Sequence, residues 1–456
     1  MSTVTALTGD PLAMLEPGTD YVAVVTDDLR ALDGSTIEPS RGTLVALGLA
    51  APASAAEAAM AGYHAPTIDF LADVGIDPEH VLRVWDFTTR TAHDADGPLM
   101  SMRDASLAAL ESGDVTVVID AVEHRPSGAI HSIVEGHFEG MPGFIDSDFE
   151  LRRGADGLPV AMGETNARFR VLIPRGTGDY RCVLFGHGAG GTVNDDSFDA
   201  TLAAEGIAKI NVEFRGWTDE EIISTLTTVA DRVLVGASQA LAPLMQSVAH
   251  SIAIERSIAG ILGDALSAPM LGGEVNPHAG RRPGLDGPIW VGGSLGGTMG
   301  LVITALDEEL HFAVLNVPGA AWSHFARNSE LFDLFIAGIR RRNGGDVNIA
   351  VLIAMSQSMF DMVDGATFSE AAVEAGDIFL AQESMGDQVL PNAGNEFVGI
   401  VTHATMVGTP ISPIYGLPTA MEVVGSSGIT QFDVGVDGVF DVHGFAANQD
   451  TVPGRA

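Results

Sequence analysis

The sequence contains one cysteine and one lysine, and both scarcities restrict what the chain can do. Cys182 is the only cysteine in 456 residues, so no intrachain disulfide forms and no cysteine cluster holds zinc. Its neighbours, 183–185, are apolar, which is typical of a buried strand and favours an unreactive core thiol. Lys209 is the only lysine, and no G-x-x-x-x-G-K-[ST] sequence occurs, which excludes a nucleotide-binding P-loop.

Positive charge and long apolar runs are also scarce. The chain has 23 Lys and Arg against 60 Asp and Glu, a formal net charge of −37. This charge repels phosphate backbones, so nucleic acid is not an expected partner, and it would suit a high-salt habitat. No run approaches the roughly 18 apolar residues of a membrane span, and the start, MSTVTALTGDPLAML, lacks the basic and apolar regions of a signal peptide. We therefore expect neither segment.

The length predicts two domains, or one large domain with an appended module. Residues 1–150 are dominated by short strands and turns with an alanine-rich helical stretch at 51–61, and they contain no set of nucleophile, base and acid. We predict a β-rich, β-sandwich-like module here. Its expected strands are 21–26, 81–89, 115–122 and 129–139.

From residue 151 to 456, strands alternate with helices, which predicts an α/β fold with a mostly parallel sheet flanked by helices. Two inserts, 267–287 and 320–376, are long enough to shape a substrate pocket, and the second is rich in Met and Phe. Single apolar residues of this insert are nevertheless expected to pack its own core. The expected strands are 169–173, 182–186, 208–214, 288–292, 312–317, 378–382 and 431–436.

A serine lies at the junction of one of these strands with a helix. The segment Gly292-Gly293-Ser294-Leu295-Gly296-Gly297 follows the apolar stretch 288–291 and precedes the helical run 298–303. This is the strand, sharp turn and helix of a G-x-S-x-G nucleophile elbow, in which the glycines at 292 and 296 allow the backbone to bend closely. The pattern predicts Ser294 as a nucleophile, with the helix N-terminus favouring negative charge beside it.

A second glycine-rich segment follows another apolar strand. It reads His187-Gly188-Ala189-Gly190-Gly191. Acyl transfer needs backbone N–H groups aimed at the developing oxyanion, and such loops supply them. We predict the N–H groups of Ala189, Gly190 and Leu295 as donors, with His187 and Gly188 shaping the loop.

Chain order guides the choice of a base, because the triad of an elbow serine runs Ser, acid, His. His311 and His324 precede any plausible acid strand, which leaves His403 and His443. His403 ends a helical run. His443 follows the last expected strand, where a loop could return it to Ser294, and we favour it.

An acid is expected in the loop after the strand 378–382. Asp387, in Gly386-Asp387-Gln388, fits this place and could orient the imidazole. Glu383, nearer the strand, and Asp441, close to the histidine, are the alternatives. Nothing in the sequence indicates a metal or a cofactor, and no EF-hand loop is present.

Residues 160–450 resemble the lipase and esterase branch of the α/β-hydrolase superfamily, on the motifs HGAGG and GGSLGG and, more weakly, GDQVLP. The segment LEPGTDYVAVVTDDLRALDG and the later WDFTT resemble the Ig-like N-terminal module of bacterial extracellular, virulence-factor-type lipases. The resemblance implies ester hydrolysis through an acyl-enzyme without a cofactor, an extracellular or periplasmic location, and Ser294, Asp387 and His443 as the triad. After His443 only GFAANQDTVPGRA remains, shorter than the closing helix expected of that fold.

We therefore expect a carboxylic ester hydrolase acting on small-molecule, lipid or polymer esters. An aromatic-polyester depolymerase, an amidase or peptidase, and a non-catalytic binding protein on the same scaffold remain alternatives. The sequence leaves the oligomeric state open.

Overall fold

The computed structural model describes residues 15–448, and the chain divides into two compact units at Asp94 and Ala95. The predicted boundary at residue 150 differs from this division. The physical reason is that the strands of 116–142 hydrogen-bond into the main sheet, so their backbone groups belong to the second unit. Backbone pairing partners are non-local, and strand periodicity alone does not reveal them.

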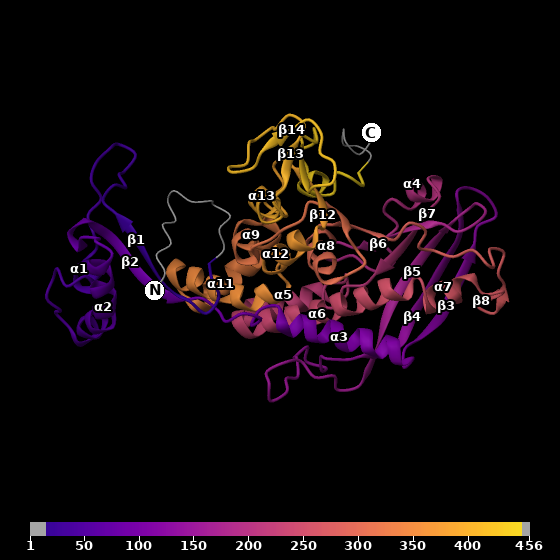
Figure 1. Ribbon diagram of the computed structural model, residues 1–456, viewed down its shortest axis with the longest axis horizontal. Coiled ribbons are helices and arrows are strands. Elements are labelled where there is room, and N and C mark those ends of the chain that lie inside the picture. The colour runs from indigo at the N-terminus through magenta and orange to yellow at the C-terminus, as the bar shows by residue number, and fades with distance from the viewer. Residues whose placement is uncertain (1–14, 449–456) are drawn as a thin grey trace. The chain divides into compact units, whose positions relative to one another are not determined.

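The first unit is a two-stranded ribbon with helices (Figure 1). Strands β1 (Asp20–Thr26) and β2 (Val81–Thr88) pair antiparallel, and α1 (Arg41–Ala46) and α2 (Ala55–Asp73) lie between them in sequence. A small core forms from Leu47, Leu71, Val81 and Val84. Within the described part of this unit, β1 and β2 form a single two-stranded sheet, whereas a sandwich needs two packed sheets. The structure therefore does not show the predicted Ig-like sandwich.

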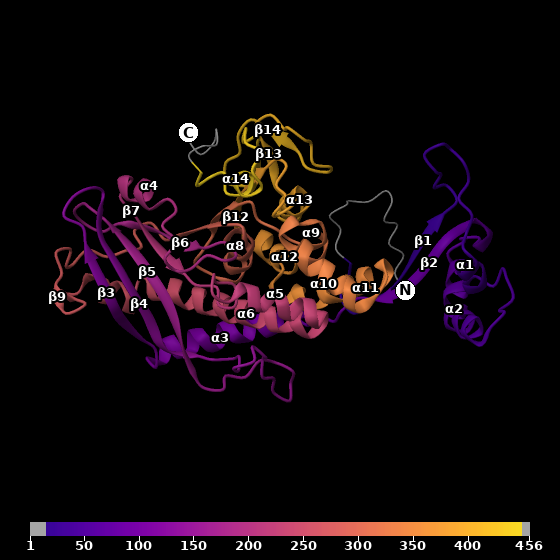
Figure 2. The same cartoon turned by 180° about the vertical axis from the view of Figure 1, so that it is seen from behind.

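The second unit is built on an eleven-stranded sheet in the order β14-β13-β15-β12-β11-β10-β6-β7-β5-β4-β3. Its strands are parallel from β14 to β7, whereas β5, β4 and β3 continue it antiparallel. The expected α/β sheet is therefore mixed, with a parallel central part (Figure 2). The bounds are β3 Thr116–His124, β4 Ile130–Pro142, β5 Glu164–Pro174, β6 Arg181–Gly186, β7 Ile207–Val212, β10 Ile289–Gly293, β11 Phe312–Asn316, β12 Ile378–Ser384, β13 Thr405–Val407, β14 Thr419–Ala420 and β15 Gly428–Phe432.

Helices flank this sheet. The long helix α6 runs beside α3 in both views and also contacts α8, which packs on β10 and β11 (Figures 1 and 2). Their bounds are α3 Gly97–Ser112, α4 Asp199–Ala204, α5 Ile222–Asp231, α6 Val233–Ser257, α7 Ile261–Ser267, α8 Leu295–Leu306, α9 Trp322–Asn328, α10 Asp333–Asn343, α11 Asp346–Phe360, α12 Gly365–Ala375, α13 Asn392–Val401 and α14 Val439–His443.

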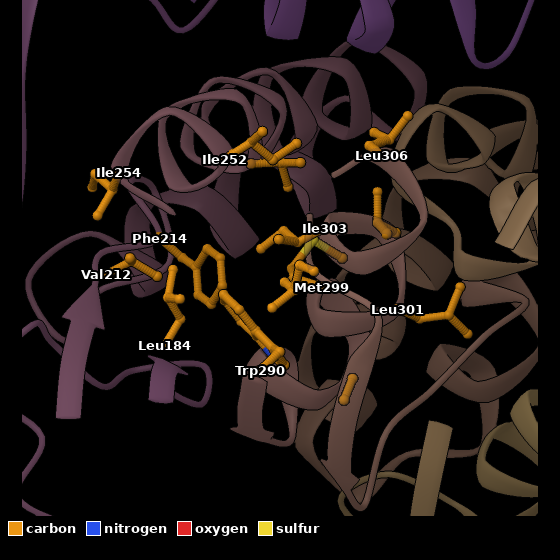
Figure 3. Packing of buried hydrophobic residues seen from close by; sticks show 14 of the residues in the cluster. Leu184, Val212, Phe214, Ile252, Ile254, Trp290, Met299, Leu301, Ile303 and Leu306 are labelled. Atoms are coloured by element: carbon orange, nitrogen blue, oxygen red, sulfur yellow. The ribbon is translucent and has the colours of Figure 1, made fainter. Parts of the chain in front are cut away.

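Part of the main core packs around Trp290 of β10 (Figure 3). Trp290 is fully buried there, and its ring lies 6.4 Å from that of Phe214. Met299 and Ile303 of α8 pack into the same cluster. The indole Nε1 of Trp290 donates a hydrogen bond to the carbonyl oxygen of Gly296, 2.9 Å away. The aromatic core thus fixes the start of α8 relative to β10.

The two inserts have different places. Residues 320–376 form α9 to α12. An 18-residue window within Asp346–Ala375 has a mean hydropathy of 1.3, as a membrane span could have, but 44% of that window is buried in the protein. A 3-10 turn separates α11 from α12. Within 267–287, β8 (Met270–Leu271) and β9 (Glu274–Val275) form a hairpin whose turn lies against β3. A Cβ on Gly272 would stand 2.7 Å from Val122, so this insert is attached at the sheet edge.

Candidate active site

Ser294 stands between β10 and α8 in a strained backbone conformation. Its φ of 57° and ψ of −118° lie outside the regions that non-glycine residues ordinarily occupy. Its N–H donates to the carbonyl oxygen of Asn316 at 2.9 Å, and its own carbonyl accepts from Thr298. These bonds hold the sharp turn that lifts the hydroxyl from the strand end.

Gly292 and Gly296, on either side of the serine, leave no space for a side chain. A Cβ on Gly292 would overlap the carbonyl oxygen of Gly296, and a Cβ on Gly296 would overlap that of Gly186. The strand, the turn and the neighbouring strand β6 therefore approach each other as closely as backbone allows. The roles assigned to these two glycines from the sequence agree with this packing.

The loop 187–191 lies directly against the serine. A Cβ on Gly188 would stand 3.4 Å from Cβ of Ser294 and 3.9 Å from its Oγ. His187 is buried and shapes the loop: Nδ1 lies 2.7 Å from the carbonyl oxygen of Gly188, and Nε2 accepts from the N–H of Phe214 at 3.0 Å. Burial lowers the pKa of His187, so the neutral ring donates through Nδ1.

This loop orients one peptide group. The carbonyl oxygen of Gly188 accepts from His187 and from the N–H of Gly191 at 2.9 Å. In a trans peptide the N–H points opposite to the carbonyl, so the N–H of Ala189 faces away from these donors. Ala189 and Leu295 line one small cavity with Ser294, and neither N–H makes a hydrogen bond within residues 15–448.

Gly190 has a different environment from the one expected for an oxyanion donor. Its N–H donates to the carbonyl oxygen of Trp217 at 2.8 Å. A donor already used by a backbone acceptor is not available to an oxyanion. Gly190 instead supplies the positive φ of 79° that the turn needs, which leaves Ala189 and Leu295 as the candidate donors.

Asp387 and His443 form a close pair. The Nδ1 of His443 lies 2.6 Å from Oδ2 of Asp387, while Oδ1 accepts from the N–H groups of Val389 and Leu390 at 2.8 and 3.0 Å. Asp387 is buried, which excludes competing water from this pair. His443 ends the short helix α14, where the sequence predicted a loop. With Nδ1 occupied, Nε2 is the ring nitrogen left for another partner.

The alternative residues lie in other environments. Glu383 bonds through Oε2 to Nε2 of Gln431, 2.9 Å away, and burial raises its pKa to about 7. Asp441 accepts from Nδ2 of Asn448 at 3.0 Å. His403 follows α13 with a φ of 53°, and it lines neither of the two cavities that border Ser294, which are described below.

A cavity of 460 Å³ opens beside the serine. Both Ser294 and His443 line it, as does Gly188. Most of the other walls are apolar and come from the ends of β6, β10, β11 and β15, from the segment 195–202 and from the residues after α14. They include Phe185, Phe198, Leu202, Val291, Val314, Val317, Phe432, Phe445, Ala446 and Ala447.

The insert 320–376 lines a second, smaller cavity beside Ser294. This space of 30 Å³ lies on the side of Ser294 formed by Ala189, Leu295 and the aromatic residues Trp322 and Phe325. No residue of either insert lines the larger cavity. Residues 267–287 pack on β3 and 320–376 pack mainly against helices, so of the two inserts only the second lies beside Ser294.

The sequence reasoning missed a buried charge cluster that supports the cavity wall. The Nζ of Lys209 donates to Oδ1 of Asp199 at 3.0 Å and to the carbonyl oxygens of Asp195 and Ser197 at 2.9 and 2.6 Å. Arg170 donates to Oδ2 of Asp199 at 2.7 Å. Burial lowers the pKa of Lys209, and Asp199 opposes this effect. The available signal was a lone lysine inside an apolar strand.

Comparison with known proteins gives limited likenesses. No family model matches the chain, and no curated protein does. An acetyl xylan esterase from a Thermoanaerobacterium species is 13% identical, with 75% of this chain and 89% of that chain covered and a TM-score of 0.44. One from a Paenibacillus species is 15% identical over the same shares, with a TM-score of 0.43. A glucuronoyl esterase from Teredinibacter turnerae is 10% identical over 73% and 77%, with a TM-score of 0.38.

Proposed function

We propose that this protein is a serine carboxylic ester hydrolase of the α/β-hydrolase type, with Ser294, His443 and Asp387 as its triad. The observation that carries the proposal is that a serine with a strained backbone shares one cavity with an imidazole whose far nitrogen is bound to a buried carboxylate. A nucleophile beside a base that a third group orients is the arrangement of covalent catalysis, and a serine or histidine with a purely structural role does not require it.

In the proposed mechanism His443 accepts the proton of Ser294 through Nε2 while Oγ attacks the ester carbonyl carbon. The C=O electron pair moves to oxygen, and the N–H groups of Ala189 and Leu295 stabilise the resulting oxyanion. As the intermediate collapses, His443 donates the proton to the departing alcohol, and Ser294 keeps the acyl group. Water, deprotonated by the same histidine, then attacks the acyl carbon. The bond from that carbon to Oγ of Ser294 breaks, His443 returns the proton to Oγ, and the acid leaves. Asp387 holds the ring and stabilises its charged form.

The cavity favours an apolar acyl or alcohol group of moderate size. Its volume of 460 Å³ is at the lower end of that of drug-sized ligand sites, and phenylalanine and valine side chains form much of its wall. The polar groups there, Asp195, Ser197, Thr201, Asn316 and Gln382, are few. We therefore propose uncharged esters of short to medium length as substrates.

The nucleophile is tested by labelling with a fluorophosphonate and mapping the modified peptide. The label is expected on Ser294, and Ser294→Ala is expected to abolish both labelling and hydrolysis of p-nitrophenyl esters. Ser197→Ala, which changes a serine of the same cavity, is the matched control and should retain both. Label on another serine, or full ester turnover by Ser294→Ala, would refute the proposal.

The acid is tested by two isosteric substitutions. Asp387→Asn should lower kcat on the order of 10⁴-fold, because the amide cannot stabilise the imidazolium. Glu383→Gln should leave kcat within a factor of a few, since this side chain bonds to Gln431 and not to the imidazole. A larger loss in Glu383→Gln than in Asp387→Asn would reverse the assignment. Turnover of anilides in place of esters would indicate an amidase on the same site.

A further inference from the structure

Three imidazoles meet at the far edge of the large sheet. His124 ends β3, His131 lies near the start of β4, and His278 follows the β8–β9 hairpin. Each offers a ring nitrogen, and these nitrogen atoms lie within 4.8 Å of one another. The three ring centroids are 5.3 to 6.4 Å apart, in edge-to-face contacts. The catalytic proposal uses none of these residues.

A buried serine orients two of the rings. The Oγ of Ser132 lies 2.8 Å from Nδ1 of His124 and 2.9 Å from Nδ1 of His131. A hydroxyl oxygen can accept two hydrogen bonds, so both rings can carry their proton on Nδ1. The lone pair of each then lies on Nε2. Metal-binding histidines are commonly held in this way, through the nitrogen that does not bind the metal.

Ring nitrogens in this cluster are buried without a partner. Across the described residues, Nε2 of His124 and both ring nitrogens of His278 are buried and make no hydrogen bond. His278 is only 3% exposed. An unpaired buried polar atom costs about 1–3 kcal/mol, and buried polar side-chain atoms in folded proteins are mostly paired. These atoms therefore point to a missing ligand.

The backbone that carries His278 is held in place independently of the rings. Asn276 accepts from the N–H of His278 through Oδ1 at 3.0 Å, and its Nδ2 donates to the carbonyl oxygens of Leu266 and Ala268 at 2.9 and 2.7 Å. The loop therefore presents the imidazole without depending on contacts among the histidines. Such preorganisation reduces the entropy lost on binding a ligand.

Two arginines lie close to the cluster. Arg281 contributes to the lowered pKa of both His278 and His131, and Arg175 to that of His131; burial is the largest cause of both shifts. Arg175 and Arg281 place positive charge nearby, so we expect weaker binding than in thiolate sites.

We propose that His124, His131 and His278 bind one divalent transition-metal ion of the zinc class, with a water or an added ligand in the fourth position. Three imidazole ligands with one open position suit Zn²⁺, and imidazole also suits Co²⁺ and Ni²⁺. At Zn–N distances of about 2.0–2.1 Å, tetrahedral ligand atoms lie about 3.3 Å apart. The three nitrogens, which lie within 4.8 Å of one another, would have to approach by at most about 1.5 Å per pair to reach that spacing, which small side-chain rotations can supply.

The site has a structural role and not a catalytic one. In the sheet order, β3 lies five strand positions from β10, which carries Ser294, and at about 4.8 Å per strand this is roughly 24 Å. A bound ion cannot contact the ester at that distance. It would instead link the insert 267–287 to the edge hairpin of β3 and β4, and so stabilise the folded state.

Metal binding is tested on the full chain after removal of metals with EDTA. Isothermal titration with Zn²⁺ should show one saturable equivalent, and Co²⁺ should give the visible ligand-field absorption of a four-coordinate site. His278→Gln should weaken Zn²⁺ affinity at least tenfold and abolish the rise in melting temperature that Zn²⁺ causes in the unchanged protein. His137→Gln is the matched control, because His137 lies on β4 but pairs with Asp120, and it should bind normally.

Two results would overturn the proposal. One is the absence of saturable Co²⁺ absorption in the unchanged protein, which needs no variant and therefore does not depend on how a variant folds. The other is equal Zn²⁺ affinity in the unchanged protein, His278→Gln and His131→Gln. Ester hydrolysis measured below the melting temperature should be the same with and without Zn²⁺, and a strict requirement for the metal would contradict the structural role.

Discussion

The hydroxyl of Ser384 donates a hydrogen bond to the carbonyl oxygen of Val442, 2.7 Å away. Ser384 ends β12, and Val442 immediately precedes His443 in α14. This buried bond therefore ties the strand that leads to Asp387 to the helix that carries the imidazole. It fixes the position of the proposed base relative to the proposed acid, although neither Ser384 nor Val442 belongs to the triad.

Ser384→Ala should test this positioning role. The carbonyl of Val442 would lose a buried donor, so we expect about 1–3 kcal/mol lower stability and a several-fold lower kcat, with KM little changed. Melting curves and ester kinetics measure both effects. Ser384→Thr retains a hydroxyl and should recover part of kcat. Unchanged kcat in Ser384→Ala would show that α14 is held by other contacts.

Glu383→Gln should change how stability depends on pH. The carboxyl ordinarily titrates near pH 4.5 and in the folded protein at about 7, because burial disfavours its charge. A raised pKa contributes stability at low pH that is lost as pH rises from 4.5 to 7, up to about 3 kcal/mol. The variant should match the unchanged protein at pH 4.5 and be more stable at pH 8.

The measurement is the melting temperature as a function of pH for both proteins. Glu308→Gln alters a carboxylate that is 83% exposed and should give a curve parallel to that of the unchanged protein. Parallel curves for Glu383→Gln as well would mean that its carboxyl titrates normally.

Lys209→Met should be strongly destabilising despite its similar volume. The substitution leaves the carboxylate of Asp199 buried with only Arg170 as its cation, and breaking a buried pair costs about 3–5 kcal/mol. Denaturant unfolding measures the loss. Arg342→Met removes an exposed pair with Asp231 and should cost about 1 kcal/mol or less. Similar losses in both variants would argue against a structural role for the buried cluster.

Substitution by alanine should destabilise the protein strongly at one glycine of the elbow and leave it nearly unaffected at the other. A Cβ on Gly296 would overlap the backbone of Gly186, so Gly296→Ala should lose more than about 3 kcal/mol or fail to fold. A Cβ on Gly293 would have its nearest neighbour at 3.7 Å, an ordinary contact, so Gly293→Ala should change stability by less than about 1 kcal/mol. Thermal melting distinguishes them, and equal effects would contradict the packing described here.

The strands and the elbow were predictable from local sequence because they depend on local properties. Apolar stretches followed by glycines located β6 and β10 to within a residue or two. The glycine spacing around Ser294 follows from a turn that spans only a few residues. Chain order then selected Asp387 and His443, and in the structure Oδ2 of Asp387 lies 2.6 Å from Nδ1 of His443. The last strand was displaced, at Gly428–Phe432 instead of 431–436, because residues 433–436 follow it without a ladder partner.

The sequence by itself determined where several central strands of the second unit lie, such as β6 and β10, and which residues have the chemistry of an elbow, because both are set largely by neighbours along the chain. Only the tertiary structure decided that β3 and β4 join the main sheet. It also decided that the N–H of Gly190 donates to the carbonyl oxygen of Trp217, and that His278 lies beside His124 and His131. These outcomes depend on which distant segments share hydrogen bonds and buried space, and the local pattern of apolar residues does not specify those partners.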